Sequence, residues 1–267
     1  MREELRSSDD ESGKPAVTIE LRVPGPWISP QQLRDALVER KTGYELTADG
    51  SLRSPDGDLI EIGTSDHDDE IAQIFRGGHH GRMTEEELVL LGTHAVKVHV
   101  VGPGGSVDPA RRVVRAAAAL VRAGGYGVFV DNSGLCHGPE DFLKLADDEQ
   151  PGGVFWAFVT ATGDPDLVYS CGMHCLGLRD VELYDPPQDQ QEAWTALHEF
   201  LGYSYQSGTE LHDGDHMGGL PDSGVPEYIM RDIPCTRFEP GTPFHNPFGV
   251  WELKRAADSE AGEVSEN

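Results

Sequence analysis

The sequence predicts an α+β protein: a mixed, largely antiparallel sheet with helices packed mainly on one face, containing one strand–helix–strand crossover unit. Three patterns predict this class. Short segments alternate apolar and polar side chains, as half-buried strands do. Longer segments repeat apolar side chains at helical spacing and begin with capping residues. The two kinds of segment alternate along only part of the chain, which favours a mixed sheet over a fully parallel one.

The first quarter of the chain predicts a strand, a helix and a group of short strands. Residues 16–23 alternate apolar and polar side chains. Ser29 is placed to cap the helix that follows. Residues 44–62 predict short strands joined by Asp-Gly turns. We expect a short helix at residues 65–76, with Ser65 as its N-cap.

The middle of the chain predicts the crossover unit. Thr84 and Glu87 form a capping box at the start of a short helix. A strand is predicted at residues 96–100. Asp108 is then expected to cap an amphipathic helix, and a second strand follows at residues 126–130. A strand, a helix and a strand in this order fit a crossover connection between parallel strands.

The rest of the domain mixes short helices and strands, and residues 154–159 and 167–171 are expected to pair as a hairpin. The ends of the chain are too polar to bury apolar surface. We therefore expect disordered tails at residues 1–15 and 256–267 around a single domain at residues 16–255. The remaining predicted elements are helices at 140–146 and 190–201, and strands at 154–159, 167–171, 181–184, 227–233 and 250–253.

The charge of the chain limits the classes of partner. There are 21 basic residues against 47 acidic ones, a formal net charge of −26. A phosphate backbone and an anionic membrane surface would both be repelled, so we expect neither nucleic-acid binding nor membrane binding. An acidic surface suits a basic protein partner. The alternative is that the acidic surface only keeps the protein soluble.

The state of the four cysteines depends on the compartment, which the targeting signals of the sequence predict. The cysteines are Cys136, Cys171, Cys175 and Cys235. The start of the chain lacks the basic and apolar regions of a signal peptide, and no apolar run approaches the roughly 20 residues that cross a bilayer. We therefore expect a cytoplasmic protein whose cysteines stay reduced.

One polar loop could hold a metal ion. His212, Asp213, Gly214, Asp215 and His216 follow one another, and imidazole and carboxylate groups are ligands for divalent cations. His212, Asp215 and His216 are the candidate ligands, with His79 or His80 as a further donor. The alternative is a polar turn in which the Asp side chains bond to nearby backbone N–H groups. We expect no cofactor, or in the alternative one divalent metal ion.

Two cysteine motifs have structural and chemical interpretations. Cys171, His174 and Cys175 have a spacing that zinc ligands use, but no second pair completes a four-ligand site, and core packing is the alternative. Cys136 and His137 are adjacent and could form a thiolate–imidazolium pair. Partners in such pairs are normally distant in sequence. No catalytic residues are therefore assigned.

The block from Tyr169 to Leu183, the amphipathic helix after it and the Asp213–Gly218 turn resemble, in this order, a bacterial family of unknown function, family 4261. The likeness covers roughly residues 90–255. Arg179 stands where the family pattern often has proline, and His216 where it often has threonine. The resemblance implies a compact α+β domain in bacteria. By association it also suggests an immunity-type or other protein-binding role.

These observations leave two main functions open. The first is a non-enzymatic binding protein, of immunity type in one form, whose acidic surface binds a basic protein partner. The second is a metal-binding domain or metal-dependent enzyme that uses the loop from His212 to His216. A structural domain of a larger assembly and redox sensing by Cys171 and Cys175 are further alternatives. The sequence does not define an oligomeric state.

Overall fold

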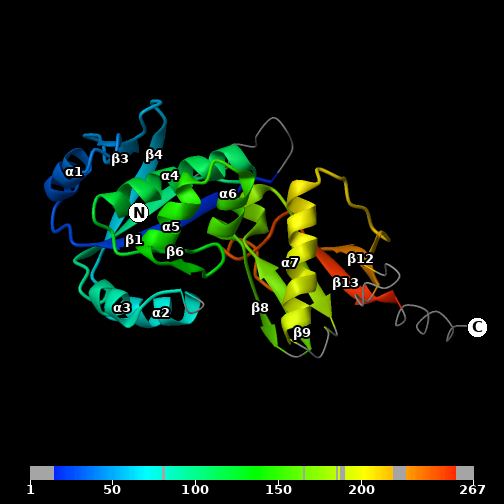
Figure 1. Ribbon diagram of the computed structural model, residues 1–267. Helices are drawn as coiled ribbons and strands as arrows, with labels where there is room; N and C mark the ends of the chain where they lie inside the picture. The colour runs from blue at the N-terminus through cyan, green and yellow to red at the C-terminus, as the bar shows by residue number, and fades with distance from the viewer. Residues whose placement is uncertain are drawn as a thin grey trace, which may run out of the picture.

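The computed structural model describes residues 15–79, 82–164, 166–184, 186, 190–218 and 227–256. In these residues the chain forms seven α-helices and two mostly antiparallel sheets, which confirms the predicted α+β class. The N-terminal strand, blue in Figure 1, lies in the first sheet, and the C-terminal strand, red, lies in the second. The predicted disordered tails at 1–15 and 256–267 lie outside the described residues, except for residues 15 and 256.

The first sheet has the strand order β2-β3-β4-β5-β1-β6-β7, and its neighbours are antiparallel throughout. β5 and β6 both run antiparallel to β1 and are therefore parallel to each other. Helix α4 (Val107–Arg122) connects them, which is the predicted crossover unit. The strands are β1 (Thr18–Gly25), β2 (Glu45–Leu46), β3 (Ser51–Arg53), β4 (Leu59–Asp66), β5 (Val96–Pro103), β6 (Val128–Val130) and β7 (Cys136–His137).

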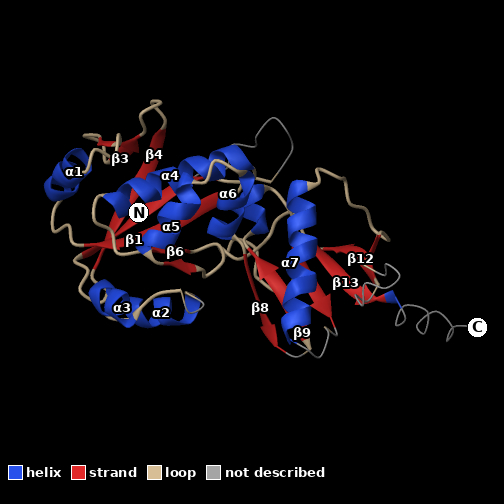
Figure 2. Ribbon diagram, viewed as in Figure 1, coloured by secondary structure: helices blue, strands red, loops and turns tan. Residues whose placement is uncertain are grey.

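The second sheet has the order β11-β12-β13-β10-β9-β8. β10 and β13 pair in parallel, and the other neighbours are antiparallel. Helix α7 (Gln190–Gln206) lies against one face of this sheet (Figure 2). The strands are β8 (Thr160–Asp164), β9 (Leu167–Cys171), β10 (Asp180–Tyr184), β11 (His216–Met217), β12 (Tyr228–Ile233) and β13 (Val250–Arg255).

Helices α4, α5 and α6 lie on one face of the first sheet, and α2 packs against β7 at one edge of the sheet. α4 packs on β1 and β5, and α5 and α6 pack on α4. α2 and α3 form a second, smaller core that includes Phe75, Leu91 and Cys136. No helix in the described parts of the chain is long and apolar enough to cross a membrane. The remaining helices are α1 (Pro30–Glu39), α2 (Ile71–Gly78), α3 (Glu85–Leu91), α5 (Pro139–Asp147), α6 (Pro151–Phe158) and the 3-10 turn η1 (Met173–Leu176).

The two sheets share one apolar core and meet closely at η1. The larger cluster of buried residues includes Leu21 of the first sheet and Leu253 of the second. The N–H of Gly105, before α4, donates a hydrogen bond to the carbonyl of Cys175 (2.9 Å). Gly177 ends η1 with φ +78°, and a Cβ there would lie 2.2 Å from the Gly105 carbonyl oxygen. Glycine is therefore required at this contact.

Two helix starts follow the sequence prediction closely. The Ser29 side chain accepts a hydrogen bond from the N–H of Gln32, and Pro30 is the first residue of α1. Thr84 and Glu87 form the complete capping box of α3. Local side-chain chemistry is sufficient to specify these starts, since each cap bonds within its own first turn.

Two other predicted helix starts are wrong. Ser65 caps no helix: it lies in β4, which pairs with β5 through Asp66, and α2 begins at Ile71. The neighbouring strand completes the backbone hydrogen bonds of this segment. Asp108 is not an N-cap, because α4 begins one residue earlier. Pro109 lies inside the first turn, where its missing N–H removes no helical bond.

The predicted strand at residues 154–159 is also wrong, because this segment belongs to helix α6. A short, continuous apolar run is compatible with a buried strand or a buried helix. Pro151 opens the helix, and Gly153 allows it to approach α5: a Cβ there would lie 2.4 Å from the Leu145 carbonyl oxygen. The hairpin predicted for this region forms instead from β8 and β9.

Candidate functional site

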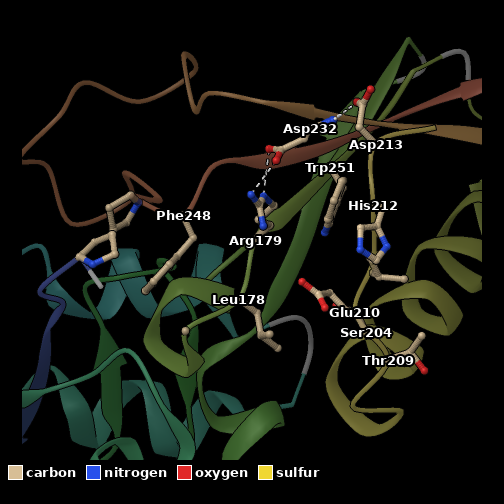
Figure 3. A pocket seen from close by; sticks show the side chains of 14 residues that line it. Leu178, Arg179, Ser204, Thr209, Glu210, His212, Asp213, Asp232, Phe248 and Trp251 are labelled. Atoms are coloured by element: carbon tan, nitrogen blue, oxygen red, sulfur yellow. Dashed lines mark hydrogen bonds and ion pairs between the residues drawn. The ribbon is translucent and has the colours of Figure 1, made fainter. Parts of the chain in front are cut away.

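A cleft of about 650 Å³ opens on the α7-covered side of the second sheet, beyond the C-terminal end of α7 (Figure 3). Most of its lining comes from the residues that follow η1, the loop between α7 and β11, and strands β12 and β13 with the residues just before β13. Pro15 and Ser204 of α7 complete it. Most of its polar walls come from segments that are far apart in sequence. The lining residues that matter below are Arg179, Glu210, His212, Asp213, Asp232 and Trp251.

The loop between α7 and β11 is shaped by its own polar groups. The Asp215 carboxylate accepts a hydrogen bond from the N–H of His212 (2.8 Å), and the Asp215 N–H donates to the His212 carbonyl (3.1 Å). Gly214 adopts φ +87°, and its N–H donates to the Met230 carbonyl of β12 (2.9 Å). These bonds are those of the polar turn that the sequence offered as the alternative to a metal loop.

A chain of contacts connects this loop to the floor of the cleft. Asp213 accepts a hydrogen bond from the N–H of Asp232 (2.8 Å). The Asp232 carboxylate accepts two bonds from Arg179, from Nε (3.0 Å) and Nη2 (2.7 Å), as the dashed lines in Figure 3 show. The Arg179 guanidinium carbon lies 4.8 Å from the ring centroid of buried Trp251. A planar guanidinium can make both interactions at once, whereas an ammonium cannot.

The cleft carries more negative than positive charge. Glu210, Asp213 and Asp232 supply three carboxylates, and Arg179 is the one arginine or lysine among the described lining residues. Arg179 is engaged by Asp232. Glu210 and Asp213 form no ion pair with any described residue. A cationic group that entered the cleft would therefore find two carboxylates not yet neutralised.

The structure does not bring the three predicted metal ligands together as one group. His212 lines the cleft described above, whereas Asp215 and His216 line a second cavity of about 730 Å³ between α7 and β11–β12. His216 Nδ1 lies 2.8 Å from a carboxylate oxygen of Glu227, across the β11–β12 pair. The Asp215 carboxylate lies 3.8 Å from His212 Nδ1, and it is already bonded to the loop backbone.

The wider metal-site hypothesis gains no support from this geometry. In the part of the chain that the structure describes, no three His, Cys, Asp or Glu side chains are grouped so that they could hold a metal ion. His79 lies at the end of α2, where its Nδ1 accepts a hydrogen bond from the N–H of Met83. His80 lies outside the described residues. Binding of a divalent ion by His212, Asp215 and His216 stays a prediction, which elemental analysis of the purified protein tests.

The cysteine motifs are packed into the cores. Cys171 and Cys175 are buried free thiols, and burial raises the pKa of both well above the usual value for a thiol. Burial also raises the pKa of Cys136 to about 12. Its neighbour His137 bonds to the Ala157 carbonyl from the other face of β7. These thiols are therefore protonated at neutral pH, which favours the packing interpretation over nucleophilic or redox chemistry.

Sequence reasoning missed the residues that complete the cleft. The sequence marks Arg179 only as a departure from a family pattern. It predicts no functional role for Asp232 or Trp251. The pairing of β12 with β13 places Asp232 directly opposite Trp251. The parallel pairing of β10 with β13 brings the chain before β10, with Arg179, beside them. The one sequence signal for this cleft was a charged residue, Arg179, just before the predicted strand at 181–184.

Comparison with known proteins gives one match. The model of a family described as a domain of unknown function, DUF4261, matches residues 169–242. This confirms the resemblance for that segment, which starts in β9 and includes η1, β10, α7 and β12. Arg179, Glu210, Asp213 and Asp232 lie inside the matched segment, and Trp251 lies outside it. The searches of curated proteins and of solved structures returned no match.

Proposed function

We propose that this chain is a binding protein whose cleft takes a cationic side chain of a basic protein partner. The observation that supports this most is the charge of the lining: Glu210 and Asp213 lack ion-pair partners among the described residues, and Arg179 is already engaged by Asp232. A lysine or arginine would form charge-assisted hydrogen bonds there. The immunity-type role that the family resemblance suggests is one form of this proposal.

The end of α7 adds to the attraction. Ser204, in the last turn of α7, lines the cleft, and the helix ends at Gln206. The carbonyl groups at a helix C-terminus carry partial negative charge and favour a nearby cation, typically by about 0.3–1 kcal/mol. The volume of about 650 Å³ lies within the range of ordinary ligand sites. One or two long side chains would fit in it.

The charge of the whole chain acts over a longer range. At −26 it attracts basic partners before contact and speeds their association. This contribution weakens as salt rises, because the Debye length shortens to about 8 Å at physiological ionic strength. Residues 169–242 contain no lysine, and their three arginines are Arg179, Arg231 and Arg237. The segment that matches the family model is thus strongly acidic as well.

The test uses a fluorescent hexalysine peptide and measures its binding by anisotropy at low and physiological salt. The double variant Glu210→Gln/Asp213→Asn should weaken binding about tenfold or more, since each neutralised carboxylate contributes on the order of 1 kcal/mol. The matched control is Glu39→Gln/Glu86→Gln, which removes the same charge from exposed positions on α1 and α3. It should weaken binding less than twofold.

Two results would refute the proposal. One is equal weakening by both double variants, because bulk charge and not the cleft would then bind the peptide. The other is the absence of binding at low salt. A tetraglutamate peptide serves as the negative control and should not bind.

A further inference from the structure

Three polar side chains on the first sheet form a continuous hydrogen-bonded chain outside the cleft. Ser65 Oγ of β4 lies 2.7 Å from His99 Nε2 of β5. His99 Nδ1 lies 2.7 Å from Glu20 Oε1 of β1. The three strands are neighbours in the sheet, so the contacts run from strand to strand across its surface. The same residue types in this order make up a nucleophile, a base and an orienting carboxylate.

The chemistry of the contacts fixes the direction of the bond to Glu20, and the neutral form of His99 then sets the direction of the bond to Ser65. A carboxylate can only accept, so the His99 nitrogen that faces Glu20 carries a proton. In the neutral imidazole the other nitrogen, Nε2, then has a free lone pair. In this neutral form the Ser65 hydroxyl donates to Nε2. This is the tautomer in which a histidine can remove the proton of a serine.

The pleat of the sheet places the group on a polar, accessible face. Ile19 and Leu21 of β1 are fully buried, and Glu20 between them points to the opposite side and is partly exposed. Ser65 and His99 are also only partly buried. Gly63 stands directly opposite His99 in the register of β4 and β5, so no side chain covers the imidazole from that position.

A cation stands beside the serine. Lys97 is the register partner of Ser65, on the same face of the sheet. Its ammonium group donates one hydrogen bond, to Asp68 (2.6 Å), and has further hydrogens. The ion pair with Asp68 offsets part of this positive charge, and the remainder would stabilise negative charge that develops on an oxygen next to Ser65. On the other side, Arg22 Nε lies 3.8 Å from the Glu20 oxygen that faces His99.

We propose that Ser65, His99 and Glu20 form a nucleophilic triad that hydrolyses carboxylic esters. Ser65 Oγ forms a bond to the ester carbonyl carbon while its proton passes to His99 Nε2, and the carbonyl electron pair moves to oxygen beside Lys97. Collapse of this intermediate breaks the bond to the alcohol oxygen, which takes the proton from His99. Water then attacks the acyl-serine by the same route, with His99 as base, and releases the acid and free Ser65. Glu20 is a positioning residue that holds the His99 tautomer.

This activity is independent of the cleft and of the proposed basic partner. No residue of the triad lines the cleft in Figure 3. Glu20 does line a separate cavity of about 320 Å³ together with Thr18 and Asn132, and this cavity could receive the part of an ester remote from the reacting carbonyl.

The test is reaction of the whole chain with a fluorophosphonate reporter, followed by peptide mass spectrometry. In this reaction a serine oxygen–phosphorus bond forms, fluoride leaves and the serine proton passes to the base. We expect the adduct on Ser65. The variant His99→Asn should slow labelling at least about 100-fold, the scale of general-base catalysis. Ser51→Ala, on β3 of the same sheet, is the matched control and should not change the rate.

Turnover of p-nitrophenyl acetate supplies the second measurement. Ser65→Ala and His99→Asn should remove the protein-dependent rate. Glu20→Gln should lower it, and Glu20→Asp should restore part of it, which loss of fold would not produce. Wild-type protein with no adduct on Ser65, labelling that is indifferent to His99→Asn, or no turnover above the Ser65→Ala background would each overturn the proposal. The first of these results needs no variant, so it stands even if a variant fails to fold.

Discussion

Replacing Arg179 by glutamine should have opposite effects on stability and on binding of a cationic peptide. Arg179 makes two hydrogen bonds to Asp232 and stacks on Trp251, so its removal deletes a local set of contacts. The same change removes the one arginine or lysine that lines the cleft among the described residues and leaves the Asp232 carboxylate without its partner. The cleft gains one unit of net negative charge.

The structure limits the size of both effects. The side chains of Arg179 and Asp232 are 34% and 41% exposed, so their ion pair belongs to the partly screened class, which contributes about 0.2–1 kcal/mol. Stacking of the guanidinium on Trp251 adds about 0.5–1 kcal/mol. The free energy of unfolding should therefore fall by about 1–2 kcal/mol. One released carboxylate near the bound cation is worth about 1 kcal/mol, or roughly fivefold tighter binding.

The assay pairs urea denaturation with the hexalysine anisotropy titration. Arg179→Lys is the matched control: it keeps the positive charge and loses the bidentate geometry, so it should destabilise the fold without tightening binding. Weaker binding by Arg179→Gln would refute the reasoning, because it would mean that the arginine itself contacts the ligand. In that case the cleft would accept an anionic group and not a cationic one.

Three further predictions follow from single residues. Gly177→Ala should lower the free energy of unfolding in urea by about 1–3 kcal/mol through its positive φ alone, and by more through the clash with Gly105. The control Gly202→Ala, in open space on α7, should raise the free energy of unfolding by about 0.5–1 kcal/mol. Cys235, which is partly exposed, should be the one cysteine of four to react with a thiol reagent before unfolding, and a second fast thiol would contradict the burial argument. Burial outweighs the arginine bonded to Asp131 and raises the pKa of that carboxyl to about 6. Between about pH 4 and 6 the Asp131 carboxyl is therefore protonated in the native state and ionised in the unfolded state. The free energy of unfolding should fall by at most about 3 kcal/mol as pH rises through this window. Urea titrations of wild type and Asp131→Asn at both pH limits measure this loss, which the variant should lack.

Helix boundaries that depend on local bonds could be predicted from the sequence. Ser29 and the pair Thr84–Glu87 cap their helices as expected, since each bond closes within one turn. Ser65 failed as a cap because a distant strand, β5, competes for the same backbone. The apolar run at 154–159 failed because a fully buried helix and a fully buried strand share the same pattern. Tertiary packing decides such cases.

The candidate sites show the same division. The polar turn around Asp215 was among the alternatives read from the sequence, because its bonds are local. The separation of His212 from His216 into different cavities was not predictable, since it depends on how the loop passes between α7 and β12. The contact between Arg179 and Asp232 joins residues that are 53 positions apart, so no local sequence pattern predicts it.

The α+β class, the crossover unit, most of the elements, the strong negative charge and the likeness to family 4261 could be predicted from the order of amino acids. These properties depend on composition and on short-range periodicity. The division of the strands into two sheets, the cleft and the hydrogen-bonded chain from Ser65 through His99 to Glu20 depend instead on long-range packing. Such features arise where strand register brings together side chains that are 34 and 79 residues apart, and strand pairing over that range is set by the whole core.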